Sequence, residues 1–275
     1  MKSHLPVFAD LVDSFGRVGQ QLTALGAAEG AAGNLSVFVR SFEGVVDERF
    51  RLWDVVDLPI AVPELADGWL LVTASGSRLR DVAGMPEKTM CLLNILKGGS
   101  EAARYAVQDL RPSSEWNSHL AVHQQRVHVT SSHFHAVVHA QPRYTAYLSH
   151  LNAYGDTARW NCALLRWQPE MVLAFPEGMG FLPYATPGSR EQMVQTAEGL
   201  GRYRAVIWAR HGVVTRSECG LETAADLVEY LEVAAQMEYM NLLAGQAASG
   251  LSRAELAQIC EQYGVRASIL EEVFK

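Results

Sequence analysis

Short apolar segments that end at glycine or proline alternate along this chain with longer segments of helical spacing. Apolar positions between Phe8 and Leu25 recur every three or four residues, which predicts an amphipathic helix. The same reasoning predicts strands at 35–40, 69–73, 136–140, 171–175 and 205–208, and helices after Ser114, from 221 onward and near 252–262. Because this order lacks a regular strand–helix–strand period, we expect an α/β fold in which helices cover one central sheet.

The composition is that of a globular protein. The 275 residues are 49% hydrophobic and 19% charged, and without a repeat or linker they predict a single domain over residues 1–275. A net charge of −7 argues against nucleic acid or an anionic membrane as partner, and no apolar run approaches the roughly 18 residues that cross a bilayer. Four scattered cysteines and a start without a signal-peptide core predict a cytoplasmic protein with reduced thiols.

Polar side chains with the chemistry of metal ligands stand near the ends of the predicted segments. His139 and Gln141 lie two residues apart at the end of a strand, so their side chains share one face. His211 follows another strand, directly before Gly212. With Glu115, the two histidines form the minimum protein set for a catalytic zinc site of the His2Glu type, which leaves positions open for substrate.

Two other ligand sets are consistent with the spacing. Glu115, His119 and His123 share one face of the predicted helix at intervals of four residues, and histidines four apart can bind zinc. His133 and His135 have the strand parity of the histidine at 139, so they would be ligands if that strand began early.

Three polar turns have the character of an anion site. They are Gly33-Asn34, Ser75-Gly76-Ser77 and Ser113-Ser114. Backbone N–H groups and hydroxyls in such turns bind an anion without lysine. A serine of the last turn is also predicted to cap the following helix, with Glu115 in the first helical turn.

Taken together, these segments resemble the class II aldolase/adducin family over nearly the whole chain. The matching motifs are Gly33-Asn-Leu-Ser36, Val72-Thr-Ala-Ser-Gly76, Ser114-Glu115 with His119 and His123, Val138-His139, Phe175-Pro-Glu-Gly178 with Leu182-Pro183 and Pro187-Gly188, and His211-Gly212. The order and spacing of these motifs are more specific than any one of them. The resemblance implies a central, mainly antiparallel sheet flanked by helices, in a cyclic homotetramer with active sites between neighbouring subunits.

The resemblance also implies roles for individual residues. Glu115, His139 and His211 would stand at the ligand positions of a divalent metal, most commonly Zn²⁺, and Glu115 would double as acid/base. Glu170 falls where the family has a second glutamate near the reacting centre. The implied phosphate-binding residues are Asn34, Ser75, Gly76 and Ser114.

The implied activity is that of a lyase. A metal-dependent aldolase would reversibly cleave a ketose 1-phosphate, similar to rhamnulose 1-phosphate, into dihydroxyacetone phosphate and a short aldehyde such as L-lactaldehyde. The metal would act as a Lewis acid on the substrate oxygens and stabilise the enediolate that cleavage leaves.

Three positions depart from the family pattern. Gln141 stands where the family has a histidine, and it would be a weak or water-bridged fourth metal ligand, because an amide oxygen suits zinc less well than imidazole does. Ala31 and Ser77 stand where the most similar members have asparagine and lysine. Two alternatives therefore stay open: an enzyme of the same fold with another reaction, such as a sugar-phosphate epimerase or dehydratase, or a non-catalytic, adducin-like oligomeric protein with a degraded metal site.

Overall fold

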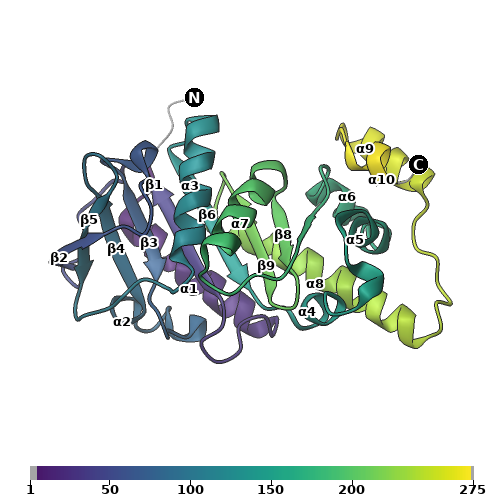
Figure 1. Cartoon of the computed structure of the whole chain (residues 1–275), viewed down its shortest axis with the longest axis horizontal. Coiled ribbons are helices and arrows are strands. Elements are labelled where there is room, and N and C mark those ends of the chain that lie inside the picture. Colours follow the sequence, from purple (N-terminus) through teal and green to yellow (C-terminus); the bar gives the residue numbers. More distant parts are fainter. Residues whose placement is uncertain (1–4, 274–275) are drawn as a thin grey trace.

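A computed structural model describes residues 5–273 and contains a nine-stranded sheet (Figure 1). The strands are β1 (Asn34–Val39), β2 (Arg51–Asp57), β3 (Trp69–Thr73), β4 (Met90–Ile95), β5 (Glu101–Ala106), β6 (Phe134–Ala140), β7 (Gly180–Leu182), β8 (Ala205–Trp208) and β9 (Gly212–Ser217), in the spatial order β2-β5-β4-β3-β1-β6-β9-β8-β7. Only β7 and β8 pair in parallel, and the other neighbours are antiparallel. The expected central, mainly antiparallel sheet is therefore confirmed.

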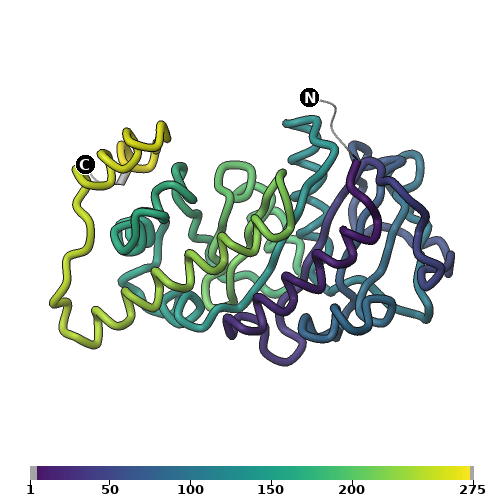
Figure 2. Tube along the Cα trace, turned by 180° about the vertical axis from the view of Figure 1, so that it is seen from behind, coloured from purple at the N-terminus to yellow at the C-terminus, as the bar shows by residue number. Residues whose placement is uncertain are grey.

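Helices cover both faces of the sheet. The helical elements are α1 (Phe8–Ala24), η1 (Pro63–Leu65), η2 (Leu79–Asp81), α2 (Pro86–Thr89), α3 (Trp116–Thr130), α4 (Arg143–Leu148), η3 (Asn152–Tyr154), α5 (Thr157–Leu164), α6 (Pro169–Ala174), α7 (Arg190–Arg202), α8 (Leu221–Leu243), α9 (Arg253–Tyr263) and α10 (Ile269–Val273). Figure 1 shows α3 and α7 in front of the sheet, and Figure 2 shows α1 and α8 across its back. Among residues 5–273, no helix combines the length and apolarity that crossing a bilayer requires.

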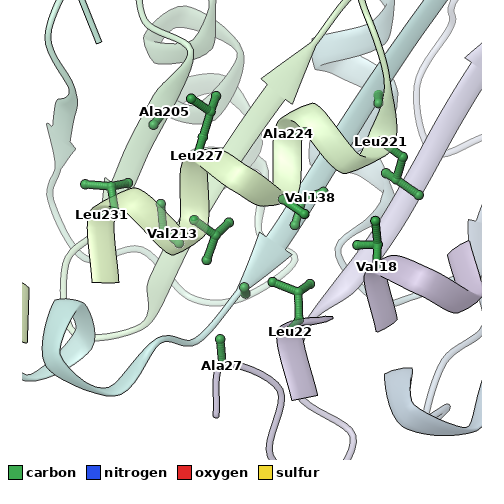
Figure 3. Close-up of a cluster of buried hydrophobic side chains, with 14 of the residues drawn as sticks. Val18, Leu22, Ala27, Val138, Ala205, Val213, Leu221, Ala224, Leu227 and Leu231 are labelled. Carbon is green, nitrogen blue, oxygen red and sulfur yellow. The ribbon is translucent and has the colours of Figure 1, made fainter. Parts of the chain in front are cut away.

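The largest core lies between the sheet and the helices α1 and α8 (Figure 3). Val18 and Leu22 of α1 point toward Val138 of β6, and Leu227 of α8 belongs to the same cluster of buried side chains. Each large apolar side chain of this kind contributes about 1.5–3 kcal/mol to the stability of the fold when it is fully removed from water. The helical spacing read from residues 8–25 thus corresponds to the face by which α1 packs on the sheet.

Strand β1 is buried along its whole length because helices cover both of its faces. Leu35 and Val37 point into the core beneath α1 and α8, whereas Phe38 belongs to a second cluster with Leu120 of α3. Since side chains alternate along a strand, Asn34 and the other even-numbered residues of β1 lie on the α3 face. This face carries the polar residues of the candidate site.

One predicted strand is wrong. Residues 171–174 belong to helix α6, whose first residue is Pro169, and Phe175 is the C-cap residue. Proline favours this position because its fixed φ suits a helix and its missing N–H is not needed there. Met171 and Val172 are buried, and short buried helices and short buried strands share the same apolar composition. Strands β2, β4, β5, β7 and β9 were not predicted.

Candidate metal centre

The antiparallel sheet brings four distant segments to one of its ends. Asn34 begins β1 and lies opposite His139, which is near the end of β6. Gly212 begins β9, next to β6, and His211 immediately precedes it. Glu115 is the residue before α3, which packs on β6. The predicted carboxylate and imidazoles therefore meet in space.

Glu115 lies between the two histidines. Its Oε2 is 3.5 Å from Nε2 of His139, and its Oε1 is 3.6 Å from Nε2 of His211. The potential ligand atoms of the three residues all lie within 4.8 Å of one another. Glu115 and His139 are buried, while His211 is partly exposed. One oxygen and two nitrogen atoms thus converge on one point with access from solvent on the His211 side.

Hydrogen bonding prepares His139 as a ligand. Its Nδ1 lies 3.0 Å from the backbone carbonyl of Val213, which can only accept, so Nδ1 carries the proton. Nε2 therefore carries the lone pair, and it is buried with no hydrogen-bond partner. A second nitrogen that donates to a carbonyl is the usual arrangement of a metal-binding histidine. This orphaned nitrogen is the strongest sign that the residues fit a metal ion.

Aromatic packing fixes both imidazole rings. The indole of Trp208 stacks on the ring of His211 with centroids 5.0 Å apart, and its centroid is 4.6 Å from that of His139. Trp208 is itself held by a 2.8 Å hydrogen bond from Nε1 to the hydroxyl of Thr196 on α7. The orientation of the ligands is thus set by packing before any ion binds.

Gln192 of α7 also reaches the cluster. Its Oε1 accepts a 2.7 Å hydrogen bond from the N–H of Gly188, which orients the amide. Its Nε2 then lies 3.4 Å from Oε1 of Glu115 and 3.3 Å from Nδ1 of His211. Sequence reasoning missed Gln192, because nothing in its local pattern separates it from other helical glutamines. Its burial on an otherwise polar helix is visible only in the fold.

The charge of the site suits a divalent cation. Burial alone would raise the pKa of the Glu115 carboxyl, but attraction to the two imidazoles and a 2.9 Å hydrogen bond from Asn34 outweigh it, so this pKa lies below its usual range. Burial, followed by repulsion from His139, lowers the pKa of His211 to about 4. At neutral pH the cluster therefore presents an ionised carboxylate and an uncharged His211.

The start of α3 differs from the prediction. Glu115 is the N-cap residue, not a member of the first turn, and neither Ser113 nor Ser114 caps the helix. Trp116 N–H is satisfied by the carbonyl of Ser113 instead. Because the Glu115 side chain makes no capping hydrogen bond, its carboxylate is free to face the histidines. The position that normally serves helix stability serves the site here.

Gly212 allows the two ligand strands to approach closely. A Cβ on this residue would lie 2.4 Å from the carbonyl oxygen of Ala140, 3.1 Å from the ring of His139 and 3.2 Å from Cγ of Gln141. Gln141 therefore lies beside His139 at the mouth of the cluster. Its N–H donates to the carbonyl of Ala27, and no hydrogen bond of its side chain is among the described contacts.

The predicted phosphate residues lie at the same end of the sheet. The segment after β3 runs beside the segment before α3, with Ser75 N–H donating to the carbonyl of Arg111 at 2.8 Å. Ser75, Gly76 and Ser114 are exposed, whereas Asn34 is buried and directed at Glu115. Ser114 and Arg111 line a cavity of about 480 Å³.

The rival ligand sets are not part of the metal cluster. His119, His123 and His135 are buried in a separate hydrogen-bonded chain with Ser36, and His133 is exposed. Each of the three buried histidines already has a partner on at least one ring nitrogen within the protein, and His123 has one on both. The spacing of four residues on α3 thus has a structural use other than zinc ligation.

Glu170 lies apart from the cluster. It is exposed in the first turn of α6 and lines a cavity of about 420 Å³ with residues of α8, including Asp226 and Glu229. Within one chain, Glu170 and the three converging ligands therefore belong to different surfaces.

Comparison with known proteins agrees with this fold. The family described as "Class II Aldolase and Adducin N-terminal domain" matches residues 14–239. A rhamnulose-1-phosphate aldolase of Bacteroides thetaiotaomicron is 27% identical over 266 residues, covering 94% of this chain and 97% of that protein. A rhamnulose-1-phosphate aldolase of Yersinia pestis is 27% identical over 76% of this chain and 77% of its own length.

Solved structures show the same architecture. A sugar-phosphate aldolase from Thermotoga maritima superposes with a TM-score of 0.74 at 27% identity, covering 88% of this chain and 99% of that one. An L-fuculose 1-phosphate aldolase shares the fold, with a TM-score of 0.61 at 22% identity over 95% of this chain and 99% of that one. The family match spans most of the chain, and the chain belongs to the class II aldolase and adducin family.

Proposed function

We propose that this protein is a divalent-metal-dependent aldolase that cleaves a ketose 1-phosphate into dihydroxyacetone phosphate and a short aldehyde. Rhamnulose 1-phosphate is the proposed substrate and L-lactaldehyde the proposed aldehyde, in line with the relatives matched over most of the chain. The observation that carries the proposal is the Glu115 carboxylate placed between His139 and His211, with Nε2 of His139 buried and unpartnered.

Glu115, His139 and His211 would hold the metal, with Zn²⁺ as the proposed ion. A bound divalent ion supplies Lewis-acid stabilisation of negative charge on the substrate oxygens. Glu115 accepts the proton of the substrate hydroxyl during cleavage and returns it during aldol addition. Its depressed pKa keeps it ionised and ready to act as the base. Asn34 donates a hydrogen bond to one of its oxygens, which restrains the orientation of the carboxylate.

Phosphate would bind where the loop after β3 meets the start of α3. Ser75, Gly76 and Ser114 offer exposed hydroxyl and N–H groups there, and Gly76 has open space where a side chain would stand. Ser77 supplies no positive charge, but the exposed Arg111 lines the cavity beside Ser114. We assign to Arg111 the attraction that a lysine would otherwise provide.

Glu170 would act from a second copy of the chain. It lies on a surface away from the three ligands of its own subunit, so only an assembly can bring it to a reacting centre. A cyclic homotetramer with sites between subunits would do so, because each interface joins different surfaces of neighbouring copies.

The test combines metal content with product formation. Protein purified without chelator is analysed for transition metals, and dihydroxyacetone phosphate release from rhamnulose 1-phosphate is followed with a coupled reporter. We expect close to one ion per chain and activity that a chelator removes and zinc restores. Less than a tenth of an equivalent of metal, with no rescue by zinc, manganese or cobalt, would contradict the proposal.

Gln141 favours one alternative, an enzyme of the same family with another substrate or reaction. Its Cγ lies beside the closest approach of β6 and β9, so its amide changes the polarity at the mouth of the cluster. Incubation with a panel of ketose phosphates and other hydroxylated acids separates the proposed aldolase from this alternative. Activity confined to rhamnulose 1-phosphate rejects the alternative, and turnover without dihydroxyacetone phosphate release favours it.

A further inference from the structure

A chain of three histidines and a serine runs through the interior from the metal centre. The hydroxyl of Ser36 lies 2.7 Å from Nδ1 of His119 and 2.7 Å from Nε2 of His123. Nδ1 of His123 lies 2.7 Å from Nδ1 of His135. All four side chains are at most 1% exposed. Nε2 of His119 at one end and Nε2 of His135 at the other have no partner in the described structure.

The chain follows directly from helix and strand geometry. His119 and His123 stand one and two turns after Glu115 on the buried face of α3. Ser36 follows Asn34 on the same face of β1, and His135 lies four residues before the ligand strand's His139, on the same face of β6. The line of polar groups therefore begins at the Glu115 carboxylate and continues along the sheet beneath α3.

The three histidines of this hydrogen-bonded chain are neutral. Burial lowers the pKa of His119 to about 3, and it lowers those of His123 and His135 well below their ordinary range. A neutral imidazole has one N–H and one lone pair, so each contact fixes the next. Two sets of hydrogen bonds use the Ser36 hydroxyl as both donor and acceptor, and they run in opposite directions. A third set, in which His119 and His123 both donate to Ser36 Oγ, leaves the buried Ser36 O–H without an acceptor.

In the first set, the donors point toward the metal centre. His135 donates from Nδ1 to His123, and His123 donates from Nε2 to Ser36. The Ser36 hydroxyl donates to Nδ1 of His119, which leaves the N–H of His119 on Nε2. In the second set every donor is reversed, so His119 has a bare Nε2 and His135 keeps an N–H on its own Nε2.

The charges at the two ends favour the first set. Arg216 of β9 lies opposite Val137 of β6, and together with Arg126 of α3 it places positive charge against His135. Burial lowers the pKa of Arg216 to about 10, so it remains cationic at neutral pH. Cations disfavour an N–H at Nε2 of His135. At the other end, repulsion from His123 and His139 and attraction to the Glu115 carboxylate both act on His119, and we take the attraction to the carboxylate to favour an N–H at its Nε2.

We propose that His119 is a hydrogen-bond donor to an oxygen of the ligand bound at the metal centre, held in its Nε2–H form by Ser36, His123 and His135. His119 would touch the ligand, and the other three are positioning residues. The role in turnover rests on the proposed aldolase function, but the proton positions do not. A neutral, preorganised donor stabilises negative charge on a substrate oxygen without adding a second base beside Glu115.

Nitrogen-15 NMR of protein labelled in the histidine rings tests the proton positions without substrate. Single histidine variants assign the signals, and spectra are recorded for the metal-free and zinc-loaded protein. We expect His119 and His123 to be protonated on Nε2 and His135 on Nδ1 in both. Protonation of His119 on Nδ1, in either form, would overturn the proposal.

Two matched pairs of variants test whether the hydrogen-bonded chain controls the position of the His119 proton. Ser36→Ala breaks it, and Ser118→Ala removes another buried serine hydroxyl, on α3, that has no partner. Ser36→Ala should give His119 a mixture of both tautomers, and Ser118→Ala should leave the Nε2–H form intact. Arg216→Met should weaken the Nε2–H preference, and Arg216→Lys should restore it. Unchanged tautomers in Ser36→Ala and Arg216→Met would show that the chain does not set the proton.

Kinetics then test contact with the ligand. Ser36→Ala should lower kcat about tenfold with little change in KM, less than the ~10²–10³-fold loss of removing an oxyanion donor outright. Zinc-loaded protein titrated with dihydroxyacetone phosphate should shift the His119 Nε2 signal. A protein with the expected tautomers but no aldolase activity would refute the function alone. Active protein whose His119 signal ignores dihydroxyacetone phosphate would refute the donor role alone.

Discussion

Glu115 combines burial, negative charge and close contact with two histidines. It is buried, ionised, hydrogen-bonded by Asn34 and aligned with two imidazoles. Glu115→Gln keeps the shape and removes the base, so we expect kcat to fall by about 10²–10⁴-fold. The proton cannot leave the substrate hydroxyl without this base. Stopped assays with zinc-saturated enzyme measure the loss, and near wild-type kcat would remove Glu115 from proton transfer.

Gln192 should tune metal affinity. Its amide contacts both Glu115 and His211, and residues behind metal ligands typically contribute about 10–100-fold to affinity. We therefore expect Gln192→Leu to weaken zinc binding by that factor, measured by competition with a chromogenic chelator. Gln195→Leu, one turn further along α7 and bonded only to Glu191 there, is the control. Equal affinities in the two variants would remove Gln192 from the site.

At the residue scale, the resemblance predicted the three converging ligands, whereas local patterns missed the residue that reaches them through helix packing. The resemblance placed Glu115, His139 and His211 together, and the fold brings them within reach of one another. It assigned Asn34 to phosphate, and that role stays a prediction, since its amide donates to Glu115 in the structure. Gln192 could not be predicted, because its role depends on the packing of α7 against the start of α3.

At the level of elements, amphipathic helices and isolated strands were predicted better than strands in hairpins. The predicted helix at 8–25 corresponds to Phe8–Ala24, and the last predicted helix near 252–262 to Arg253–Tyr263, which begins with a capping box at Ser252. Strand β2 is largely exposed, and β5 alternates in burial and contains Glu101 and Arg104, so neither has the continuous apolar run of β6. Strand β5 pairs with β4 and β2 pairs with β5, and such pairing is invisible in a local pattern.

The close approach of β6 and β9 depends on Gly212. A methyl group there would meet the Ala140 carbonyl at 2.4 Å, so Gly212→Ala must push the strands apart. We expect a loss of about 1–3 kcal/mol in the free energy of unfolding, typical of overpacking, together with weaker zinc binding. Gly84→Ala is the control, because its added methyl would lie 3.9 Å from the nearest atom. Urea unfolding of the metal-free proteins measures the stability of both variants. Equal stability of Gly212→Ala and Gly84→Ala would contradict the steric account.

For the whole molecule, the buried histidines predict how stability depends on pH. The depressed pKa values of His119, His123 and His135 mean that these groups stay neutral when folded and gain protons on unfolding. The unfolded state thus binds more protons below pH ~6.5, so stability falls as the pH falls from there toward 3. With His211, whose pKa is lowered to about 4, four such groups give a slope of up to about 5 kcal/mol per pH unit.

Urea unfolding at pH 7.5, 6.0 and 5.0 measures this dependence on metal-free protein. Replacing His135 by a neutral residue such as Gln should reduce the slope by about one proton, or ~1.4 kcal/mol per unit. An acid limb with a slope below one proton would show that the chain protonates in the folded state. The arrangement of neutral tautomers would then not hold at low pH.

The assembly decides whether Glu170 takes part in catalysis. Glu170 and the metal cluster lie on different surfaces of one chain, so a Glu115→Gln variant and a Glu170→Gln variant should each be inactive for a different reason. If every site takes Glu115 from one subunit and Glu170 from its neighbour, co-refolded mixtures contain some sites with both glutamates intact. Random mixing in equal amounts restores about a quarter of the wild-type activity, because each glutamate is intact with a probability of one half.

Separate oligomers of the two variants, mixed without exchange, should stay inactive. No recovery in co-refolded oligomers of confirmed mixed composition would mean that both glutamates serve the site of one chain, whereas full activity of Glu170→Gln alone would mean that Glu170 serves none.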